Sequence, residues 1–217
     1  MRYRSVLVSS LCFVALLGCP KRVGSQSELD ATAREKVAEA KRQADSGKPE
    51  EALKLLADVP QDNQSVAAVR FQIAEAQFAA RDFTAARNSY RDLLVNFPLF
   101  DRADLAKYRL ALSQLELKEC RDALQTLTPL YPRLSDGERP EAVAALSRAA
   151  ECARAFTDAV KWHAELMGLA RDETALAAEK RRVFDLLETR VPFLDVARLA
   201  QELPTSSPLW PMGRRPT

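Results

Sequence analysis

The feature that most constrains the fold is an internal repeat of small residues. Alanines recur at a spacing of about 34 to 38 positions, at Ala52, Ala86, Ala123, Ala159 and Ala197. Twelve positions before each lies a second matched site, held in turn by Ala40, Ala74, Ala111, Ser147 and Asp185. Small residues at matched places let two paired helices approach closely, and only Asp185 breaks that pattern. A period of this length predicts an array of helix–turn–helix units.

The hydrophobic pattern of the chain also predicts helices. From Leu29 to Leu203 the apolar residues recur every three or four positions, and Ala, Leu, Glu, Arg and Lys dominate. Helix-breaking segments divide this region at Ser46–Pro49, Val59–Pro60, Phe97–Pro98, Tyr131–Pro132, Asp136–Gly137 and Val191–Pro192. We expect helices of roughly 10 to 16 residues between these breaks.

The repeat unit resembles the tetratricopeptide repeat, most closely over residues 67–100. Ile73 and Ala74 fall in its first helix, Arg81–Ala86 in its turn, and Tyr90, Leu94 and Pro98 in its second helix and stop. The next unit matches with Leu110, Ala111, Ala123, Leu127 and Pro132. The resemblance implies an all-α array of antiparallel helix pairs over residues 31–203, degenerate in a fifth unit from Thr174. The alternative is a helical bundle without repeats.

Stacked repeats of this kind form a concave groove lined by their first helices. In the second and third units the groove candidates are Phe71, Glu75, Phe78, Tyr108, Leu112 and Leu115. Such a groove binds an extended peptide or a partner's helix. The alternative for each of the six is a place in the core.

Residues 1–18 have the pattern of an export signal. Arg2 and Arg4 precede an apolar run from Val6 to Gly18, which is too short to span a bilayer comfortably. The run ends in Leu16-Leu17-Gly18-Cys19, which resembles the lipobox of bacterial lipoproteins. The resemblance implies cleavage before Cys19 and its lipidation, and several acyl chains would hold the protein on a membrane. The alternative is an ordinary signal peptide.

The residues after Cys19 suggest where the anchor resides. Pro20 stands where an aspartate would resemble an inner-membrane retention signal. We therefore expect the periplasmic face of the outer membrane, with residues 19–30 forming the lipidated cysteine and a polar tether.

Four cysteines are present, and two of them belong to the leader and its cleavage site. Cys12 would leave with the leader and Cys19 would carry lipid, so Cys120 and Cys152 remain. An even number of thiols in an oxidising compartment predicts a disulfide. In the repeat, one would begin a helix and the other would end the next. The alternative is two independent small buried residues.

Charge and motif content argue against several classes of function. The chain has 32 basic and 30 acidic residues, and without residues 1–18 the count is 30 of each. A neutral chain lacks the basic footprint of a nucleic-acid-binding protein. No phosphate loop or nucleophile motif is present, and a lone His163 argues against histidine relays and zinc sites. We expect no cofactor, metal or small-molecule substrate, and no enzyme activity; Lys180–Arg182 is expected to be a solvated face.

The end of the chain extends the family resemblance. The lipobox, the tether, the degenerate repeats, and then Phe193–Val196 and Leu203–Leu209 resemble the helical amino-terminal region of penicillin-binding-protein activator lipoproteins. In that family a second domain like a solute-binding protein follows, and the protein stimulates a peptidoglycan synthase. Residues 204–217 are expected to form an irregular tail without a capping helix, which suggests truncation, a frame shift or completion by a partner.

These patterns predict a non-enzymatic, membrane-anchored scaffold for periplasmic proteins, with a peptidoglycan synthase as one partner class. The alternatives are a component of outer-membrane-protein assembly, an enzyme with a cryptic site, and a remnant of a longer activator lipoprotein.

Overall fold

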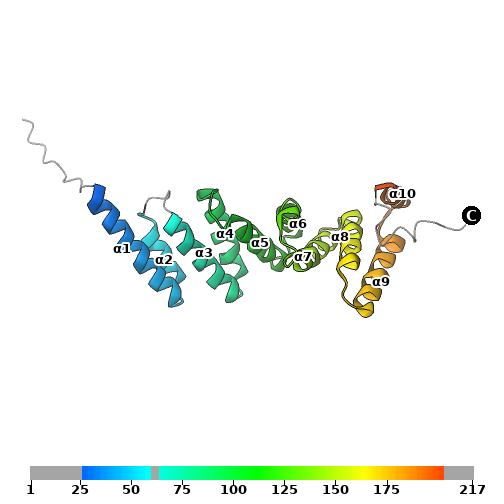
Figure 1. Ribbon diagram of the computed structural model, residues 1–217, viewed down its shortest axis with the longest axis horizontal. Coiled ribbons are helices and arrows are strands. Elements are labelled where there is room, and N and C mark those ends of the chain that lie inside the picture. Colours follow the sequence, from blue (N-terminus) through cyan, green and yellow to red (C-terminus); the bar gives the residue numbers. More distant parts are fainter. Residues whose placement is uncertain (1–25, 60–63, 203–217) are drawn as a thin grey trace, which may run out of the picture.

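The protein is an extended row of helices in a computed structural model that describes residues 26–59 and 64–202. Within those ranges there are helices and turns but no strand. The helices are α1 (Gln26–Asp45), α2 (Pro49–Leu56), α3 (Gln64–Ala79), α4 (Phe83–Asn96), α5 (Ala103–Glu116), α6 (Cys120–Leu127), α7 (Arg139–Cys152), α8 (Phe156–Leu169), α9 (Glu173–Thr189) and α10 (Phe193–Glu202), with a 3₁₀ turn, η1, at Tyr131–Arg133. Figure 1 shows them succeeding one another along one long axis, from α1 at one end to α10 at the other.

The predicted all-α array of antiparallel helix pairs is confirmed. Each helix from α1 to α9 packs chiefly against its neighbours in the chain, with the pairs α1–α2, α3–α4, α5–α6 and α7–α8, whereas α10 packs against α8. The buried side chains form three successive clusters, over α1–α5, α5–α7 and α7–α10. The core is therefore spread along the array, as in other repeat proteins.

The matched small residues lie where paired helices meet. In the first four units all eight are buried: Ala40, Ala52, Ala74, Ala86, Ala111, Ala123, Ser147 and Ala159. In the fifth unit the matched Asp185 and Ala197 are both exposed. The small residue is thus a packing requirement of the first four pairs that the fifth does not share.

A left-handed turn joins the two helices in each of the first four units. Gly47, Arg81, Lys118 and Arg154 have φ values of 78°, 62°, 63° and 59°, and each lies five residues before the matched alanine of the second helix. The next residue donates its backbone N–H to a carbonyl five residues earlier, as Asp82 does to Gln77 at 3.0 Å and Glu119 to Gln114 at 2.8 Å. This is the Schellman arrangement of a helix C-terminus.

One predicted boundary needs correction. α1 begins at Gln26, so residues 26–30 of the predicted tether are helical. The breaks at Gly47, Pro98, Pro132, Gly137 and Pro192 do lie between helices.

Three breaks carry neither Gly nor Pro, so no helix-breaking residue marks them in the sequence. Those at Lys118 and Arg154 use a residue in the left-handed conformation. The third precedes α9, where the Asp172 carboxylate caps the helix by accepting the N–H of Ala175 at 2.8 Å. Ordinary residues can therefore end or begin a helix here without a helix-breaking signal.

Candidate interaction surface

Two of the six predicted groove residues belong to the core. Phe71 is 3% exposed and Leu115 is 8% exposed. The ring of Phe71 packs against Tyr90 and Phe100, with centroids 6.1 and 5.6 Å apart. The groove prediction is therefore wrong for Phe71, because Tyr90 and Phe100 cover its ring. Leu115 is buried too, but it lines the hollow described below.

Glu75 and Phe78 join successive units. The carboxylate of Glu75, on α3, accepts a hydrogen bond from the Tyr90 hydroxyl on α4 and pairs with Arg109 Nε on α5 at 3.3 Å. The Arg109 guanidinium also lies over the Phe78 ring, 5.1 Å from its centroid. Burial, and then the bond to Glu75, raise the pKa of Tyr90. Both residues are partly exposed, but they already hold α3, α4 and α5 together.

Tyr108 and Leu112 form a half-buried stripe on α5. They are four residues apart, so they share one face of the helix, and both pack on the core cluster of α5–α7. Burial, and then the Glu141 carboxylate on α7, raise the pKa of Tyr108. The cluster on which both residues pack includes side chains of α7, and α5 contacts α7, so this stripe lies beside α7. We call Tyr108 and Leu112 the α5 stripe.

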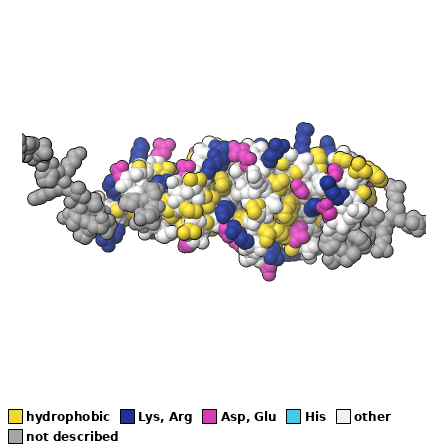
Figure 2. Space-filling model, turned by 90° about the horizontal axis from the view of Figure 1, so that it is seen from above, with side chains coloured by type: hydrophobic (Ala, Val, Ile, Leu, Met, Phe, Trp, Pro, Cys, Tyr) yellow, Lys and Arg dark blue, Asp and Glu magenta, His cyan; other side chains and the backbone are white. Residues whose placement is uncertain are grey.

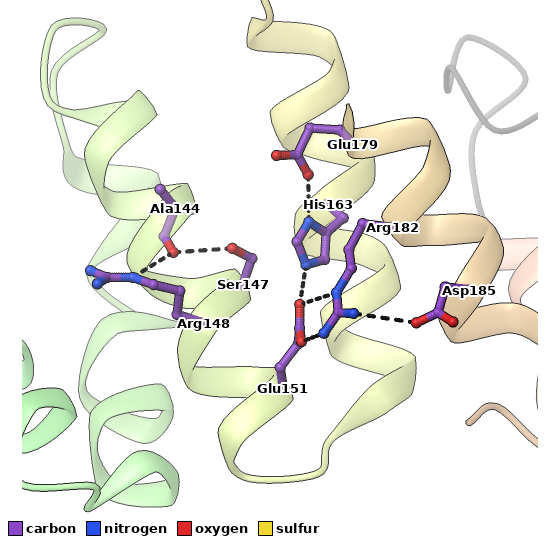
Figure 3. Close-up of polar contacts among 8 residues, drawn as sticks. All are labelled: Ala144, Ser147, Arg148, Glu151, His163, Glu179, Arg182 and Asp185. Carbon is purple, nitrogen blue, oxygen red and sulfur yellow. Dashed lines mark hydrogen bonds and ion pairs between the residues drawn. The ribbon is translucent and has the colours of Figure 1, made fainter. Parts of the chain in front are cut away.

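A hollow of about 430 Å³ lies at the C-terminal ends of α5 and α7. It is lined by Leu115, Glu116, Lys118, Arg148, Glu151 and Cys152. Arg148 Nε donates to the Ala144 carbonyl one turn earlier on α7, at 3.4 Å (Figure 3). The lining thus combines a leucine side chain with charged groups of both signs.

The structure brings the two predicted disulfide partners together. Cys120 is the first residue of α6 and Cys152 is the last residue of α7. Their sulfur atoms are in bonding contact and their Cα atoms are 5.7 Å apart, a separation typical of disulfides. A bond here ties the third unit to the fourth.

His163 is part of a network that the sequence pattern does not reveal. The side chain is buried on α8, with Nδ1 2.6 Å from Glu179 Oε2 on α9 and Nε2 2.7 Å from Glu151 Oε1 on α7 (Figure 3). Arg182 Nε donates to Glu151 at 2.9 Å, and Arg182 Nη1 contacts Asp185 at 3.2 Å. Residues 180–182 are all exposed, as predicted for a solvated face, and Arg182 in addition pairs with Glu151 and Asp185. The partners of His163 lie on other helices, so no local spacing could have identified them.

Other predicted features lie outside the described residues. These are the leader, Cys19 and the tail at 204–217. Within residues 26–59 and 64–202, no helix has the length and apolar character needed to cross a bilayer. The same ranges hold no cluster of His, Cys, Asp and Glu suited to a metal ion.

Two solved structures illustrate what this chain is similar to in three dimensions. The nearly identical TPR-like repeats of a protein named for kinesin light chain, from Podosopora anserina, align with a TM-score of 0.51 and 15% identity, over 77% of this chain and 91% of that one. MamA residues 41 to the end, from Desulfovibrio magneticus RS-1, align with a TM-score of 0.46 and 18% identity, over 74% and 98%. The first of these shows the fold alone.

Comparison at the level of sequence assigns the family. Among curated proteins there is no match. The model of the tetratricopeptide repeat-like domain matches residues 5–165, which is most of the chain. The protein therefore belongs to the tetratricopeptide repeat-like domain family.

Proposed function

We propose that the protein is a non-enzymatic scaffold. It binds another protein on the surface formed by the first helices of its repeat units, where the α5 stripe lies. The observation that carries this proposal is the half-buried pair Tyr108 and Leu112 beside the hollow at the ends of α5 and α7. Aromatic and aliphatic side chains that are part exposed, with charged groups at the rim, are the usual anchors of a protein interface. An array of helix pairs presents such side chains on a rigid frame.

We further propose that a lipid on Cys19 holds this scaffold on the periplasmic face of the outer membrane. The lipobox-like Leu16–Cys19 and the proline after it support the anchor and its location. The contact between Cys120 and Cys152 fits an oxidising compartment. The resemblance of Phe193–Val196 and Leu203–Leu209 to activator lipoproteins supports a peptidoglycan synthase as the partner.

The interaction is tested by placing a photo-crosslinking amino acid at Leu112 in cells that make the full chain. The matched control is Val95, an exposed aliphatic residue at the end of α4. We expect one discrete adduct from Leu112, lost when Tyr108 is changed to Glu, and none from Val95. Recovery of a peptidoglycan synthase supports the activator role, and recovery of an outer-membrane assembly protein supports the alternative. No adduct, or equal adducts from both positions, contradicts the proposed surface.

The anchor is tested separately by metabolic labelling with radioactive palmitate. The wild-type chain should incorporate label and fractionate with the outer membrane, and Cys19→Ser should do neither. Label that persists in Cys19→Ser contradicts the anchor but leaves the interaction surface untouched.

A further inference from the structure

The buried His163 lies between two carboxylates from different helices. Its Nδ1 is 2.6 Å from Glu179 on α9 and its Nε2 is 2.7 Å from Glu151 on α7 (Figure 3). A hydrogen atom must lie in each contact, because carboxylate oxygens and bare ring nitrogens can only accept. A neutral imidazole supplies one N–H. His163, Glu151 and Glu179, called the trio below, therefore hold one proton more than a neutral histidine with two ionised glutamates would.

The charges around the trio favour that additional proton. Glu151 contacts His163 from α7 and Glu179 contacts it from α9, and Arg182 on α9 pairs with Glu151. With the proton, two positive groups balance the two glutamates; without it, one negative charge is left uncompensated among partly buried groups. Asp185 meets the outer edge of Arg182 and is itself exposed. Towards α10, α8 presents Lys161, which pairs with Glu202 at 2.9 Å.

The trio also lies at the junction between the fourth and fifth units. Its three members come from α7, α8 and α9, and Arg182 adds a second link from α9 to Glu151. The unit that it secures lacks the buried small residue at position 185. Polar contacts therefore help to hold α9 against α7 and α8, whereas close packing of small residues holds the helices of the other units together.

We propose that His163, Glu151 and Glu179 form a proton-dependent clamp that fixes α9 to the α7–α8 pair. While the trio holds its additional proton, both contacts are made and α9 is docked. When the proton leaves, one carboxylate loses its donor and faces a second negative charge, so α9 loosens. Because a rising pH favours loss of the proton, the clamp is closed at lower pH and opens as the pH rises.

A glutamine at position 179 separates this clamp from a structural role. Its amide can donate to Nδ1, so a neutral imidazole then satisfies both neighbours. Glu179→Gln should therefore keep α9 docked and lose the pH dependence. The matched control is Lys161→Gln, which breaks an exposed pair on the same helix as His163 and should behave as the wild type does.

The experiment is amide hydrogen exchange of the full mature chain at pH 6 and pH 8.5, corrected for intrinsic exchange rates. In the wild type, α9 should lose protection about tenfold relative to α3 between the two pH values, as expected for one lost charge-assisted hydrogen bond. In Glu179→Gln the change should be less than twofold. Nitrogen-15 shifts of the His163 ring should show hydrogens at both nitrogens at pH 6. Constant α9 protection in the wild type, equal pH dependence in Glu179→Gln, or a ring with one hydrogen at pH 6 would overturn the clamp.

Discussion

The first four helix pairs and the fifth occupy similar lengths of sequence but meet their neighbours differently. In the first four, small residues are buried where the helices cross and a left-handed residue precedes the second helix. In the fifth, Asp185 and Ala197 are exposed, and Pro192 stands where Gly47, Arg81, Lys118 and Arg154 stand in the others. Proline cannot adopt a positive φ, so the turn before α10 cannot have the same geometry.

The different turn leaves hydrophobic side chains of α10 exposed on the surface. Leu199 anchors α10 in the core, but Phe193 and Leu194 are 82% and 80% exposed. Figure 2 shows hydrophobic side chains gathered at this end of the array. A repeat thus needs both its small residues and its turn to close tightly. In the unit that lacks both, the first residues of α10 stay exposed and α9 makes polar contacts with α7 and α8.

The largest expected effect comes from removing the disulfide that joins the third and fourth units. The described part of the fifth unit has no such bond. Cys120 and Cys152 are separated by 32 positions in the sequence, and a crosslink of that span contributes about 3 to 4 kcal/mol. The double variant Cys120→Ala/Cys152→Ala should lower the free energy of unfolding by that amount, measured with urea. The control is the wild type under reducing conditions, which should match the variant. A stability that does not change on reduction would show that the bond is absent.

The second prediction enlarges a matched alanine in each region. Ala86→Leu places a larger side chain where α3 and α4 meet closely and should destabilise the protein by about 2 to 3 kcal/mol. Ala197→Leu, at the matched but exposed site, should change the free energy of unfolding by less than about 0.5 kcal/mol. Urea unfolding of both variants measures the difference. Equal effects would remove the packing distinction between the two regions.

The third prediction makes the same substitution in a turn and in a helix. Gly47 has a φ of 78° and Gly168 lies near the end of α8, and a new Cβ would meet nothing within 4 Å at either site. Gly47→Ala should destabilise by about 1 kcal/mol, because alanine resists the left-handed conformation. Gly168→Ala should stabilise by about 0.5 kcal/mol, because glycine is a poor helix former. Changes in melting temperature of the same sign would contradict the turn assignment.

The smallest expected effect is a loss of folding stability at alkaline pH. It arises because tyrosine hydroxyls link elements of the second to fourth units. Burial, and then the bond to Glu165, raise the pKa of Tyr131 to about 12. A raised pKa means that the folded state favours the neutral phenol, so its contribution is present below about pH 10 and is lost as the pH rises towards 12. Tyr131→Phe should therefore lose less stability over that range than the wild type. Thermal melts across the range measure this, and parallel losses would contradict it.

The fold could be predicted from the sequence because small residues recur at matched positions of successive repeat units. Ala40, Ala74 and Ala111 are buried as their spacing implied. The turns were harder to predict, because Lys118 and Arg154 are ordinary residues in a left-handed conformation. Their constant distance of five residues before the matched alanine was the signal that could have identified them.

The candidate site was less predictable than the fold. Phe71 and Tyr108 occupy equivalent positions in successive units, yet Phe71 is buried against Tyr90 and Phe100 while Tyr108 is partly exposed. Which of two equivalent aromatic residues is covered depends on side chains from neighbouring helices, and the repeat pattern does not contain that information. The same holds for His163, whose partners come from two other helices.

The most direct test of the difference between the four regular pairs and the fifth is native-state hydrogen exchange followed along the whole array at one pH. We expect that amides of α3 to α8 share similarly high protection, that α9 has less, and that α10 has the least. Equal protection from α3 through Glu202 would contradict this difference, because the fifth pair would then be as firmly packed as the other four.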